Sequence, residues 1–320
     1  MSEPERHASF PPRSTVITVG TFDGVHRGHL ALLDALGAVA SDAGLPRVVV
    51  TFHPHPLRVV RPDTAPALLT TRTEKVELLA QAGAERVVFL RFDTTLAGYA
   101  PDRFVEEILV ERLGLARLVI GYDHGFGRDR SGDADTLRAI GARLGFAVDV
   151  VPPVRAADGA ISSTRIRNAL EAGDVRAAAR GLGRPYSCRG LVVRGDGRGR
   201  ALGYPTANLR IDDAEKLMPA EGIYAVLVHG REVSARGLLH LGPRPTFPDA
   251  APTVEVHLLD FDGDLYGESI EVSLCERLRG VQRFETVDAL VRAMDGDRAA
   301  ARALFGRGDG ACGPTGVPLA

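Results

Sequence analysis

The sequence predicts two domains: an α/β domain with a parallel sheet, then a small antiparallel β-barrel domain with a C-terminal helix. The chain has 320 residues, which is enough for two ordinary domains. Its first half alternates continuous apolar runs with amphipathic stretches, the pattern of a parallel sheet covered by helices on both faces. Its second half has short strand-like runs and glycine-rich turns, which are typical of a small barrel. We therefore expect domains at 1–183 and 184–305, and a disordered tail at 306–320.

Apolar, β-branched runs mark the expected strands of the parallel sheet, at 16–19, 48–52, 86–90, 118–121 and 147–151. Helices are expected at 29–40, 73–82, 102–113 and 134–144, followed by short helices at 163–169 and 175–181. Sheets of this kind bind ligands at the carboxyl ends of their strands. Residues 20–29, 53–55 and 121–127 each follow a strand, so we expect them to gather at one edge of the sheet.

The barrel pattern begins after Arg184–Pro185–Tyr186, where long helices give way to short strands. The expected strands are 190–193, 223–228, 234–241, 253–259 and 269–274. A terminal helix is expected at 285–305.

Composition and charge exclude several classes of protein. The formal net charge of -2 gives no reason to expect a nucleic-acid or anionic-membrane partner, and no apolar run is long enough to span a bilayer. Residues 1–13 lack an apolar segment of the secretory type, so we expect a cytoplasmic protein. Cys188, Cys275 and Cys312 are widely spaced, so we expect reduced thiols and no metal cluster.

The first candidate site is the string Gly-Thr-Phe-Asp-Gly-Val-His-Arg-Gly-His at residues 20–29. Gly20 and Gly24 allow the backbone to approach a ligand, and the helix that follows offers free N–H groups to a phosphate. His26 and His29 are three residues apart at the start of this helix, so their side chains can point the same way. Two imidazoles beside a phosphate can donate hydrogen bonds to the charge that develops on a phosphoryl oxygen. The alternative is a surface loop with solvated histidines, which the preceding strand and Phe-Asp-Gly disfavour.

This string resembles the H-x-G-H nucleotidyltransferases, which transfer a nucleotidyl group and release pyrophosphate. The resemblance implies a Rossmann-like parallel sheet of the nucleotidyltransferase type. A second element of that superfamily, Ile-Ser-Ser-Thr-Arg-Ile-Arg, stands at 161–167. Ser163 and Thr164 are suited to cap a helix, and Arg167 can hold a leaving pyrophosphate through parallel hydrogen bonds. The alternative is that these residues only cap a helix, and the presence of the H-x-G-H string in the same chain disfavours it.

The second candidate site begins with a glycine- and arginine-rich loop at 194–200 and continues into Gly-Tyr-Pro-Thr-Ala-Asn at 203–208. Glycines in such a loop can wrap phosphates with backbone N–H groups. Thr206 and Asn208 offer neutral oxygen ligands to a Mg²⁺ ion held mainly by the phosphates of a nucleotide. A P-loop is excluded because the chain has no G-x-x-x-x-G-K-[ST] string. An ordinary basic hairpin is the alternative, which the Pro-Thr-Ala-Asn string disfavours.

Glu255 is the candidate base of this second site. It lies in an alternating strand, on the face opposite Val254 and Val256. A carboxylate on a rigid strand near a metal-bound phosphate can accept the proton of an attacking hydroxyl. An exposed strand glutamate is the alternative, which the downstream string Asp-Phe-Asp-Gly-Asp-Leu-Tyr-Gly at 260–267 disfavours.

The two halves together resemble the bacterial bifunctional riboflavin kinase/FAD synthetase family, over nearly the whole chain. The strings that carry the resemblance are 20–29, 51–56, 161–167, 182–186, 195–208 and 255–267. The family implies a C-terminal domain that phosphorylates riboflavin with ATP to give FMN. It implies an N-terminal domain that adenylylates FMN with a second ATP to give FAD and pyrophosphate. The implied cofactor is Mg²⁺ with ATP, and the implied partners are riboflavin, FMN and ATP.

The resemblance also implies roles for particular residues. In the adenylylation site, His26, His29 and Arg167 are catalytic, and the ATP contacts are Gly20, Phe22, Asp23, Gly24, Ser163 and Thr164. In the kinase site, Glu255 is the base, and the ATP contacts are Gly197, Gly199, Pro205, Thr206 and Asn208, with Thr206 and Asn208 also as metal ligands. The implied flavin contacts are Phe52, His55, Asp123, Phe126 and Arg279.

Two positions depart from the family pattern: His124 stands where phenylalanine is usual, and His240 where asparagine is common. Neither departure falls on a residue assigned to chemistry. One alternative is another H-x-G-H enzyme, acting on pantetheine phosphate, nicotinamide mononucleotide or a cytidylyl acceptor, which leaves the barrel without a role. A second is a flavin-binding or regulatory protein with one inactive site. Self-association is left open by the sequence.

Overall fold

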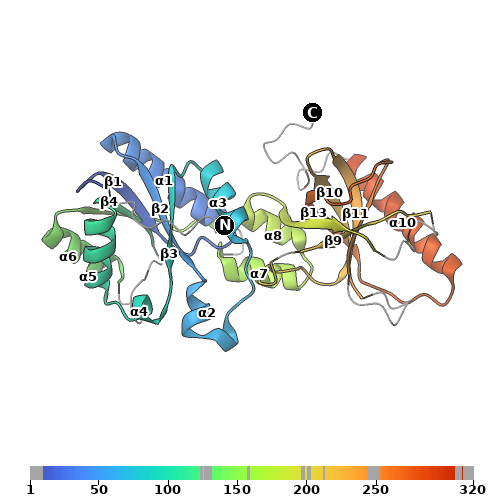
Figure 1. The fold of residues 1–320 in the computed structure, drawn as a ribbon, viewed down its shortest axis with the longest axis horizontal. Helices are drawn as coiled ribbons and strands as arrows, with labels where there is room; N and C mark the ends of the chain where they lie inside the picture. The colour runs from blue at the N-terminus through green and yellow to red at the C-terminus, as the bar shows by residue number, and fades with distance from the viewer. Residues whose placement is uncertain are drawn as a thin grey trace. The chain divides into compact units, whose positions relative to one another are not determined.

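The computed structural model describes residues 10–122, 125, 132–156, 159–195, 199, 203–211, 213–243, 253–306 and 312. The chain divides into two compact units, Met1–Ser163 and Thr164–Ala320. The first holds a parallel sheet and the second a closed antiparallel barrel that is followed by a helix (Figure 1). The predicted fold class is therefore confirmed.

The first unit is built on a five-stranded parallel sheet with the order β3-β2-β1-β4-β5. Its strands are β1 (Thr15–Val19), β2 (Arg47–His53), β3 (Arg86–Arg91), β4 (Leu115–Gly121) and β5 (Ala147–Val151). The chain moves outward from β1 through β2 and β3, then returns to β4 on the other side of β1. Open α/β sheets bind ligands at the carboxyl ends of the strands where the order reverses in this way. Gly20, the first residue after β1, lies at that edge.

Both faces of the sheet are buried, as the continuous apolar strands predict. Val16 and Val49 pack in one cluster with residues of α1 (Arg27–Ala43) and α3 (Arg72–Gln81). Their strand neighbours Ile17 and Val48 pack in another cluster on the opposite face. The second cluster includes residues of α5 (Pro101–Phe104), the π-helix η2 (Val105–Arg112) and α6 (Ala134–Leu144). Because neighbouring strand residues point to opposite faces, two clusters mean that helices cover the sheet on both sides.

Several smaller elements of the first unit were not predicted. They are α2 (Pro56–Val60), the 3-10 turn η1 (Pro62–Thr64), α4 (Thr94–Ala97) and the hairpin of β6 (Arg155–Ala156) and β7 (Gly159–Ala160). The single helix expected at 102–113 is divided into α5 and the π-helix η2. A π-helix differs from an α-helix in its hydrogen-bond spacing, and over so few turns the apolar pattern does not distinguish the two.

The second unit is a closed barrel with the strand order β10-β11-β12-β9-β8-β13. Its strands are β8 (Tyr186–Val193), β9 (Ala207–Arg210), β10 (Gly222–His229), β11 (Ser234–Gly242), β12 (Thr253–Leu258) and β13 (Ser269–Arg279). Tyr224, Leu239 and Val256 are in register across β10, β11 and β12, and all three are fully buried. This row faces the interior of the barrel. Residues on either side of it along each strand therefore face outward.

The sequence did not predict β9, because the Pro-Thr-Ala-Asn string reads as a turn. Pro205 cannot donate to a ladder, but the strand begins two residues later, at Ala207. β9 lies between β8 and β12 and pairs with both. Without it the barrel would remain open.

Helices α7 (Ser163–Glu171) and α8 (Val175–Leu182) connect the sheet to the barrel along the chain. Most of α7 and all of α8 belong to the second unit. Ala220 N donates to Leu170 O at 2.9 Å, and Arg176 Nη2 lies 2.6 Å from Glu276 Oε2 on β13. The compact units divide at 163/164, whereas the sequence placed the domain boundary at 183/184, which stays a prediction.

The terminal helix α10 (Val287–Gly306) agrees with the expected helix to within two residues. Beyond it, Cys312 forms a disulfide with Cys275 of β13, with the two Cα atoms 5.3 Å apart. The expectation of three reduced thiols is wrong for this pair, whereas Cys188 is a buried thiol. The two cysteines are 37 residues apart in the sequence, and this spacing does not predict a disulfide. The pairing depends on the path of the chain after α10.

Candidate active sites

The turn that joins β1 to α1 has a strained backbone held in place by burial. Phe22 and Val25 have positive φ angles of 47° and 40°, which side-chain-bearing residues rarely adopt. Both side chains are buried in the core beneath α1. Gly24, between them, has a φ of 83°, which costs glycine little. The predicted glycine-dependent turn is therefore present, and apolar packing supports its strained neighbours.

Asp23 holds this turn to the segment before α3. Its Oδ2 accepts a hydrogen bond from Leu69 N at 3.1 Å, and its Oδ1 accepts from Thr70 N at 3.1 Å. Thr70 Oγ1 in turn accepts from Gly24 N at 3.1 Å. The Asp23 side chain is buried, so these contacts within the chain account for a buried carboxylate. A contact between Asp23 and ATP stays a prediction.

Lys75 of α3 adds a positive charge to this support. Its Nζ donates to Thr21 O at 2.8 Å, and Thr51 Oγ1 donates to the same oxygen at 3.1 Å. Burial lowers the pKa of Lys75 from 10.5, and the negative charge of Asp23 acts in the opposite direction. Sequence reasoning did not find this residue. The available signal was its rarity, because Lys75 and Lys216 are the chain's two lysines.

His26 and His29 cap the first turn of α1 reciprocally. His29 N donates to His26 Nδ1 and His26 N donates to His29 Nδ1, both at 3.3 Å. The rings stack, with their centroids 3.6 Å apart and an angle of 12° between the planes. A backbone N–H can donate only to an unprotonated Nδ1, so each neutral ring carries its proton on Nε2. The predicted pair thus faces one way and offers two Nε2–H donors at a helix N-terminus.

The other residues predicted for this site are divided between the two compact units. Ser163 Oγ donates to Asp23 O at 2.9 Å, which ties the Ser-Thr element to the turn. Thr164 and Arg167 belong to the second unit, where Arg167 is buried. Their roles in adenylylation stay predictions. Gly20 N donates to Val50 O at 3.0 Å.

Two of the predicted flavin contacts of the first unit lie within the described residues. Phe52 packs edge-on against Phe92, with the ring centroids 5.4 Å apart. His55 precedes α2, and its Nδ1 accepts from Leu57 N at 3.2 Å. Asp123, Phe126 and the divergent His124 lie outside the described residues. Flavin contacts at this sheet edge therefore stay predictions.

The second candidate site is an outward-facing row of polar residues on three barrel strands. Glu255 of β12 pairs with Asn208 of β9 on one side and with His240 of β11 on the other. Directly opposed residues of antiparallel strands have close side chains on the same face. His240 therefore stands next to the candidate base. Register across three strands, which is not visible in the local sequence, decides this.

Both carboxylate oxygens of Glu255 accept a hydrogen bond from a threonine hydroxyl. Thr206 Oγ1 donates to Oε2 at 3.1 Å, and Thr253 Oγ1 donates to Oε1 at 2.7 Å. Thr206 immediately precedes β9, whereas Thr253 begins β12. The structure thus brings the Pro-Thr-Ala-Asn string and Glu255 together, as predicted. Thr253 was missed, although its place two residues before Glu255 on an alternating strand indicates the same face.

Gly195 and Gly199, two described residues of the arginine-rich loop, lie close to this cluster. A side chain at Gly195 would place its Cβ 2.2 Å from the Asn208 amide nitrogen. At Gly199, a Cβ would lie 2.3 Å from Tyr204 O and 3.2 Å from Thr206 Oγ1. Backbone at these positions is in contact with the predicted metal ligands only because no Cβ intervenes. Gly197 lies outside the described residues.

Tyr204 and Pro205 connect the site to α10. The Tyr204 hydroxyl donates to Asp295 Oδ1 at 2.5 Å, and Pro205 O lies 2.8 Å from His257 Nδ1. Burial raises the pKa of Tyr204, and its hydrogen bond with Asp295 adds to this effect. A phenol that stays protonated can keep this hydrogen bond. The string is therefore anchored at both ends, by Tyr204 to the helix and by β9 to the barrel.

Arg279, predicted to contact flavin, is engaged within the protein. Its Nε donates to Asp297 Oδ1 at 2.9 Å and its Nη2 donates to Asp297 Oδ2 at 2.7 Å. This two-point ion pair is mostly buried and joins the end of β13 to α10. A guanidinium held in this way is oriented rather than free, so a flavin contact stays a prediction.

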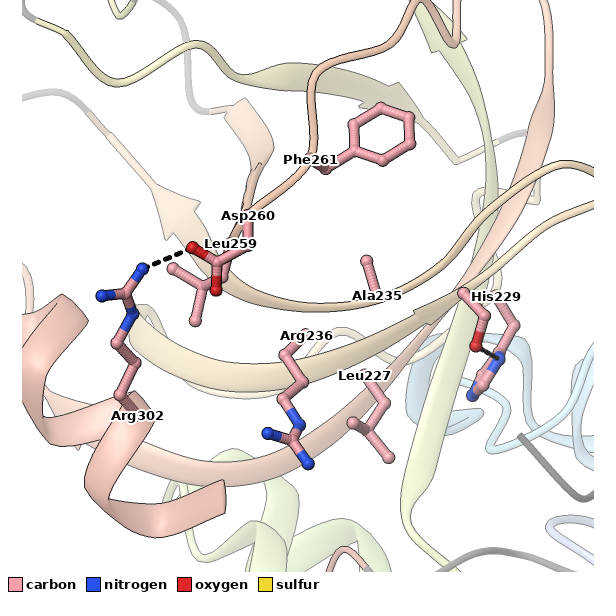
Figure 2. Close-up of a pocket in the computed structure, with 9 residues that line it drawn as sticks. Leu227, His229, Ala235, Arg236, Leu259, Asp260, Phe261 and Arg302 are labelled. Atoms are coloured by element: carbon pink, nitrogen blue, oxygen red, sulfur yellow. Dashed lines mark hydrogen bonds and ion pairs between the residues drawn. The ribbon is translucent and has the colours of Figure 1, made fainter. Parts of the chain in front are cut away.

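Two cavities open on the barrel beyond the end of β12. The larger has a volume of about 620 Å³ and is lined by Leu227, His229, Ser234, Ala235, Arg236, Leu259, Asp260, Phe261 and Arg302 (Figure 2). Figure 2 shows the Arg302–Asp260 ion pair at its rim, which has a distance of 2.5 Å. The smaller, about 300 Å³, shares this rim and also includes His257 and Arg298. Both of these residues contact the Tyr204 ring, so the smaller cavity adjoins the Pro-Thr-Ala-Asn string.

The two candidate sites present different chemical groups to a substrate. The first has paired imidazole donors at a helix N-terminus, which suits nucleotidyl transfer. The second has a carboxylate beside neutral oxygen ligands, which suits phosphoryl transfer to a hydroxyl. The chain is therefore a two-site enzyme of the phosphate-transfer class.

Comparison with known proteins identifies the family. Residues 9–165 match the family model described as FAD synthetase, and residues 182–305 match the one described as riboflavin kinase. A bifunctional riboflavin kinase/FMN adenylyltransferase from Pseudomonas fluorescens is 42% identical over 293 residues, 91% of this chain and 93% of the relative. Its namesake from Escherichia coli K12 is 39% identical over 297 residues, 92% of this chain and 94% of the relative. The chain belongs to the bifunctional riboflavin kinase/FMN adenylyltransferase family.

A solved structure agrees with this fold over both units. It is a Streptococcus pneumoniae protein described as a macrolide-efflux protein, with 34% identity and a TM-score of 0.84 over 92% of this chain and 96% of that one. Within the described residues of the present chain, no helix is long and apolar enough to cross a membrane. The predicted family, the predicted pair of activities and the order of the two modules along the chain are confirmed.

The pKa of Lys75 can be tested directly, because the chain has two lysines. With ¹³C-labelled lysine side chains, NMR should show two titrating resonances, and Lys75→Met should remove one. We expect that one to titrate below 10.5, because burial disfavours the charged ammonium. The unfolded chain then binds this proton more tightly, so the group's contribution to stability should rise as the pH approaches 10.5. A Lys75 resonance that titrates at or above the value in denatured protein would contradict the expectation.

Proposed function

We propose that the barrel phosphorylates riboflavin and that the H-x-G-H turn then adenylylates the resulting FMN, with the residues described above in specific roles. The observation that carries the proposal is the contact between Thr206 and Glu255, which brings the two kinase strings of the sequence into one site. The substrates are riboflavin, FMN and ATP, and the proposal requires neither a nucleic acid nor a membrane. A cytoplasmic location and self-association stay predictions.

In the kinase reaction, Glu255 accepts the proton of the ribityl 5′-hydroxyl. The hydroxyl oxygen forms a bond to the γ-phosphorus of ATP while the bond between that phosphorus and the bridging oxygen breaks, and ADP leaves. The β-strand fixes the backbone of Glu255, and its side chain faces outward from the barrel, where a substrate can reach the carboxylate. Phosphoryl transfer depends mainly on such positioning and on charge neutralisation.

Thr206 and Asn208 suit a Mg²⁺ ion that arrives with ATP. The Thr206 hydroxyl has one proton, which it donates to Glu255, so its oxygen lone pairs remain for a cation. The Asn208 amide oxygen is a second neutral oxygen donor, the ligand type that Mg²⁺ prefers. When bound, the ion would neutralise charge on the phosphates. The smaller cavity beside His257 and Arg298 is our proposed place for the nucleoside part of ATP.

In the adenylylation reaction, an oxygen of the FMN phosphate attacks the α-phosphorus of ATP. The bond from that phosphorus to the oxygen bridging toward the β-phosphate breaks, and pyrophosphate leaves. His26 and His29 donate from Nε2 to oxygens on which charge increases, so no protein nucleophile is needed. The N–H groups at the start of α1 and the positive charge of Lys75 favour the same anion.

The function as a whole is tested by chromatography of the products from riboflavin, ATP and Mg²⁺. FMN should appear first and FAD second, because the product of one reaction is the substrate of the other. FAD from supplied FMN, without any conversion of riboflavin, would confine the activity to the first unit. Absence of both products would support a binding protein or another H-x-G-H substrate instead.

The variant His26→Asn separates helix capping from catalysis. Asparagine is a good N-cap, so the melting temperature should change little, but the Nε2–H donor is lost. We expect the rate of FAD formation from FMN to fall by about 100-fold or more, with FMN formation from riboflavin unchanged. His229→Asn, on the barrel hairpin, is the matched control. Full FAD formation by His26→Asn would remove His26 from the mechanism.

The variant Glu255→Gln tests the kinase base. The amide keeps the shape of the side chain but cannot accept the proton, so we expect kcat for FMN formation to fall by about 100-fold or more. Adenylylation of supplied FMN, which is assigned to the first unit, should continue at the wild-type rate, and an unchanged melting temperature should show that the barrel is folded. Glu232→Gln, an exposed change on the same barrel, is the control. Unchanged kinase turnover in Glu255→Gln would rule out the assigned role.

A further inference from the structure

We infer that Thr253 is a positioning residue of the kinase reaction, which holds the Glu255 carboxylate in the orientation that accepts the substrate proton. The inference rests on the proposed role of Glu255. Thr253 is not among the residues that the family resemblance implied. The hydrogen bond from Thr253 Oγ1 to Glu255 Oε1, at 2.7 Å, is its starting point.

The carboxylate is held from two directions. Thr253 reaches Oε1 from the same strand, two residues earlier, and Thr206 reaches Oε2 at 3.1 Å from the residue before β9. Each oxygen accepts a hydrogen bond from a hydroxyl, and an ionised carboxylate has about four acceptor sites in all. The group can therefore be held at both oxygens and still accept the proton of a substrate hydroxyl.

Restraint at both oxygens matters because the last torsion of a glutamate is soft. Rotation about the Cγ–Cδ bond has broad minima, so an untethered carboxylate samples many orientations. Two donors from different chain segments define the plane of the group, whereas one donor leaves it free to turn. Removing the Thr253 hydroxyl should therefore lower the fraction of time that a lone pair points at the reacting hydroxyl.

The two threonines differ in what else they do. Thr206 is proposed to bind the cation that accompanies ATP, so changing it would alter nucleotide binding as well as the base. Thr253 has no proposed contact with substrate or metal. It lies at the start of β12, opposite Gly242 of β11, where a change from threonine to valine preserves shape and β-propensity. A loss of turnover without a loss of binding is thus the signature of positioning.

The test compares Thr253→Val with Thr253→Ser. Valine removes the hydroxyl, and we expect kcat for FMN formation to fall about tenfold, while KM for riboflavin and for ATP stays within about twofold. Serine keeps the hydroxyl and should retain at least about half of the wild-type kcat. FAD formation from supplied FMN should be unchanged in both variants, which confines the effect to the kinase reaction, and an unchanged melting temperature is the control for folding of the barrel. Thr253→Ala provides the same comparison if valine lowers the melting temperature.

A double-mutant cycle shows whether Thr253 acts through Glu255. In a Glu255→Gln background, Thr253→Val should cause no further loss, because the carboxylate it positions is absent. An equal loss in both backgrounds, or a wild-type kcat for both Thr253→Val and Thr253→Ala, would overturn the inference while leaving the base in place. If Glu255→Gln itself kept full kinase activity, the proposed function of Glu255 and this inference would fall together.

Discussion

The pairing of β9 with β12 is the constraint on which the second unit depends. It joins Asn208 to Glu255 and Ala207 to Val256 in register. The same contact closes the barrel, buries Val256 in its interior and brings the Pro-Thr-Ala-Asn string against the candidate base. In an antiparallel ladder, a shift of one residue would turn Glu255 into the apolar interior. Fold and chemistry are therefore specified by one short set of hydrogen bonds.

The first unit relies on a different device, a buried carboxylate. Asp23 accepts hydrogen bonds from the backbone of Leu69 and Thr70, and so ties the ligand-facing turn to a segment far along the chain. Buried carboxylates are costly unless they are fully hydrogen-bonded, so this arrangement tolerates little local rearrangement. The turn can then keep Phe22 and Val25 in conformations that they rarely adopt. Rigid placement of His26 and His29 is the result.

In the proposed reactions, both sites meet phosphate largely with neutral groups rather than with flexible cationic side chains. Imidazole Nε2–H groups, backbone N–H groups and hydroxyls are fixed by the fold, so little reorganisation is needed when charge moves during a reaction. Lys75 contributes its charge from a buried position, through contact with Thr21 O. Thr206 is another such neutral group, because its hydroxyl can donate to Glu255 and still offer lone pairs to a cation.

The sequence by itself determined the parallel sheet, the barrel and the H-x-G-H turn, and it assigned the Pro-Thr-Ala-Asn string and Glu255 to one site. These features rest on local patterns: apolar periodicity, glycine at strand ends, and two strings with specific chemistry. Tertiary structure decided the features that depend on contacts between distant segments. It placed His240 opposite Glu255, made a strand of β9, engaged Arg279 with Asp297 and joined Cys275 to Cys312. Register and chain direction arise from the packing of the whole barrel, which no short stretch of sequence encodes.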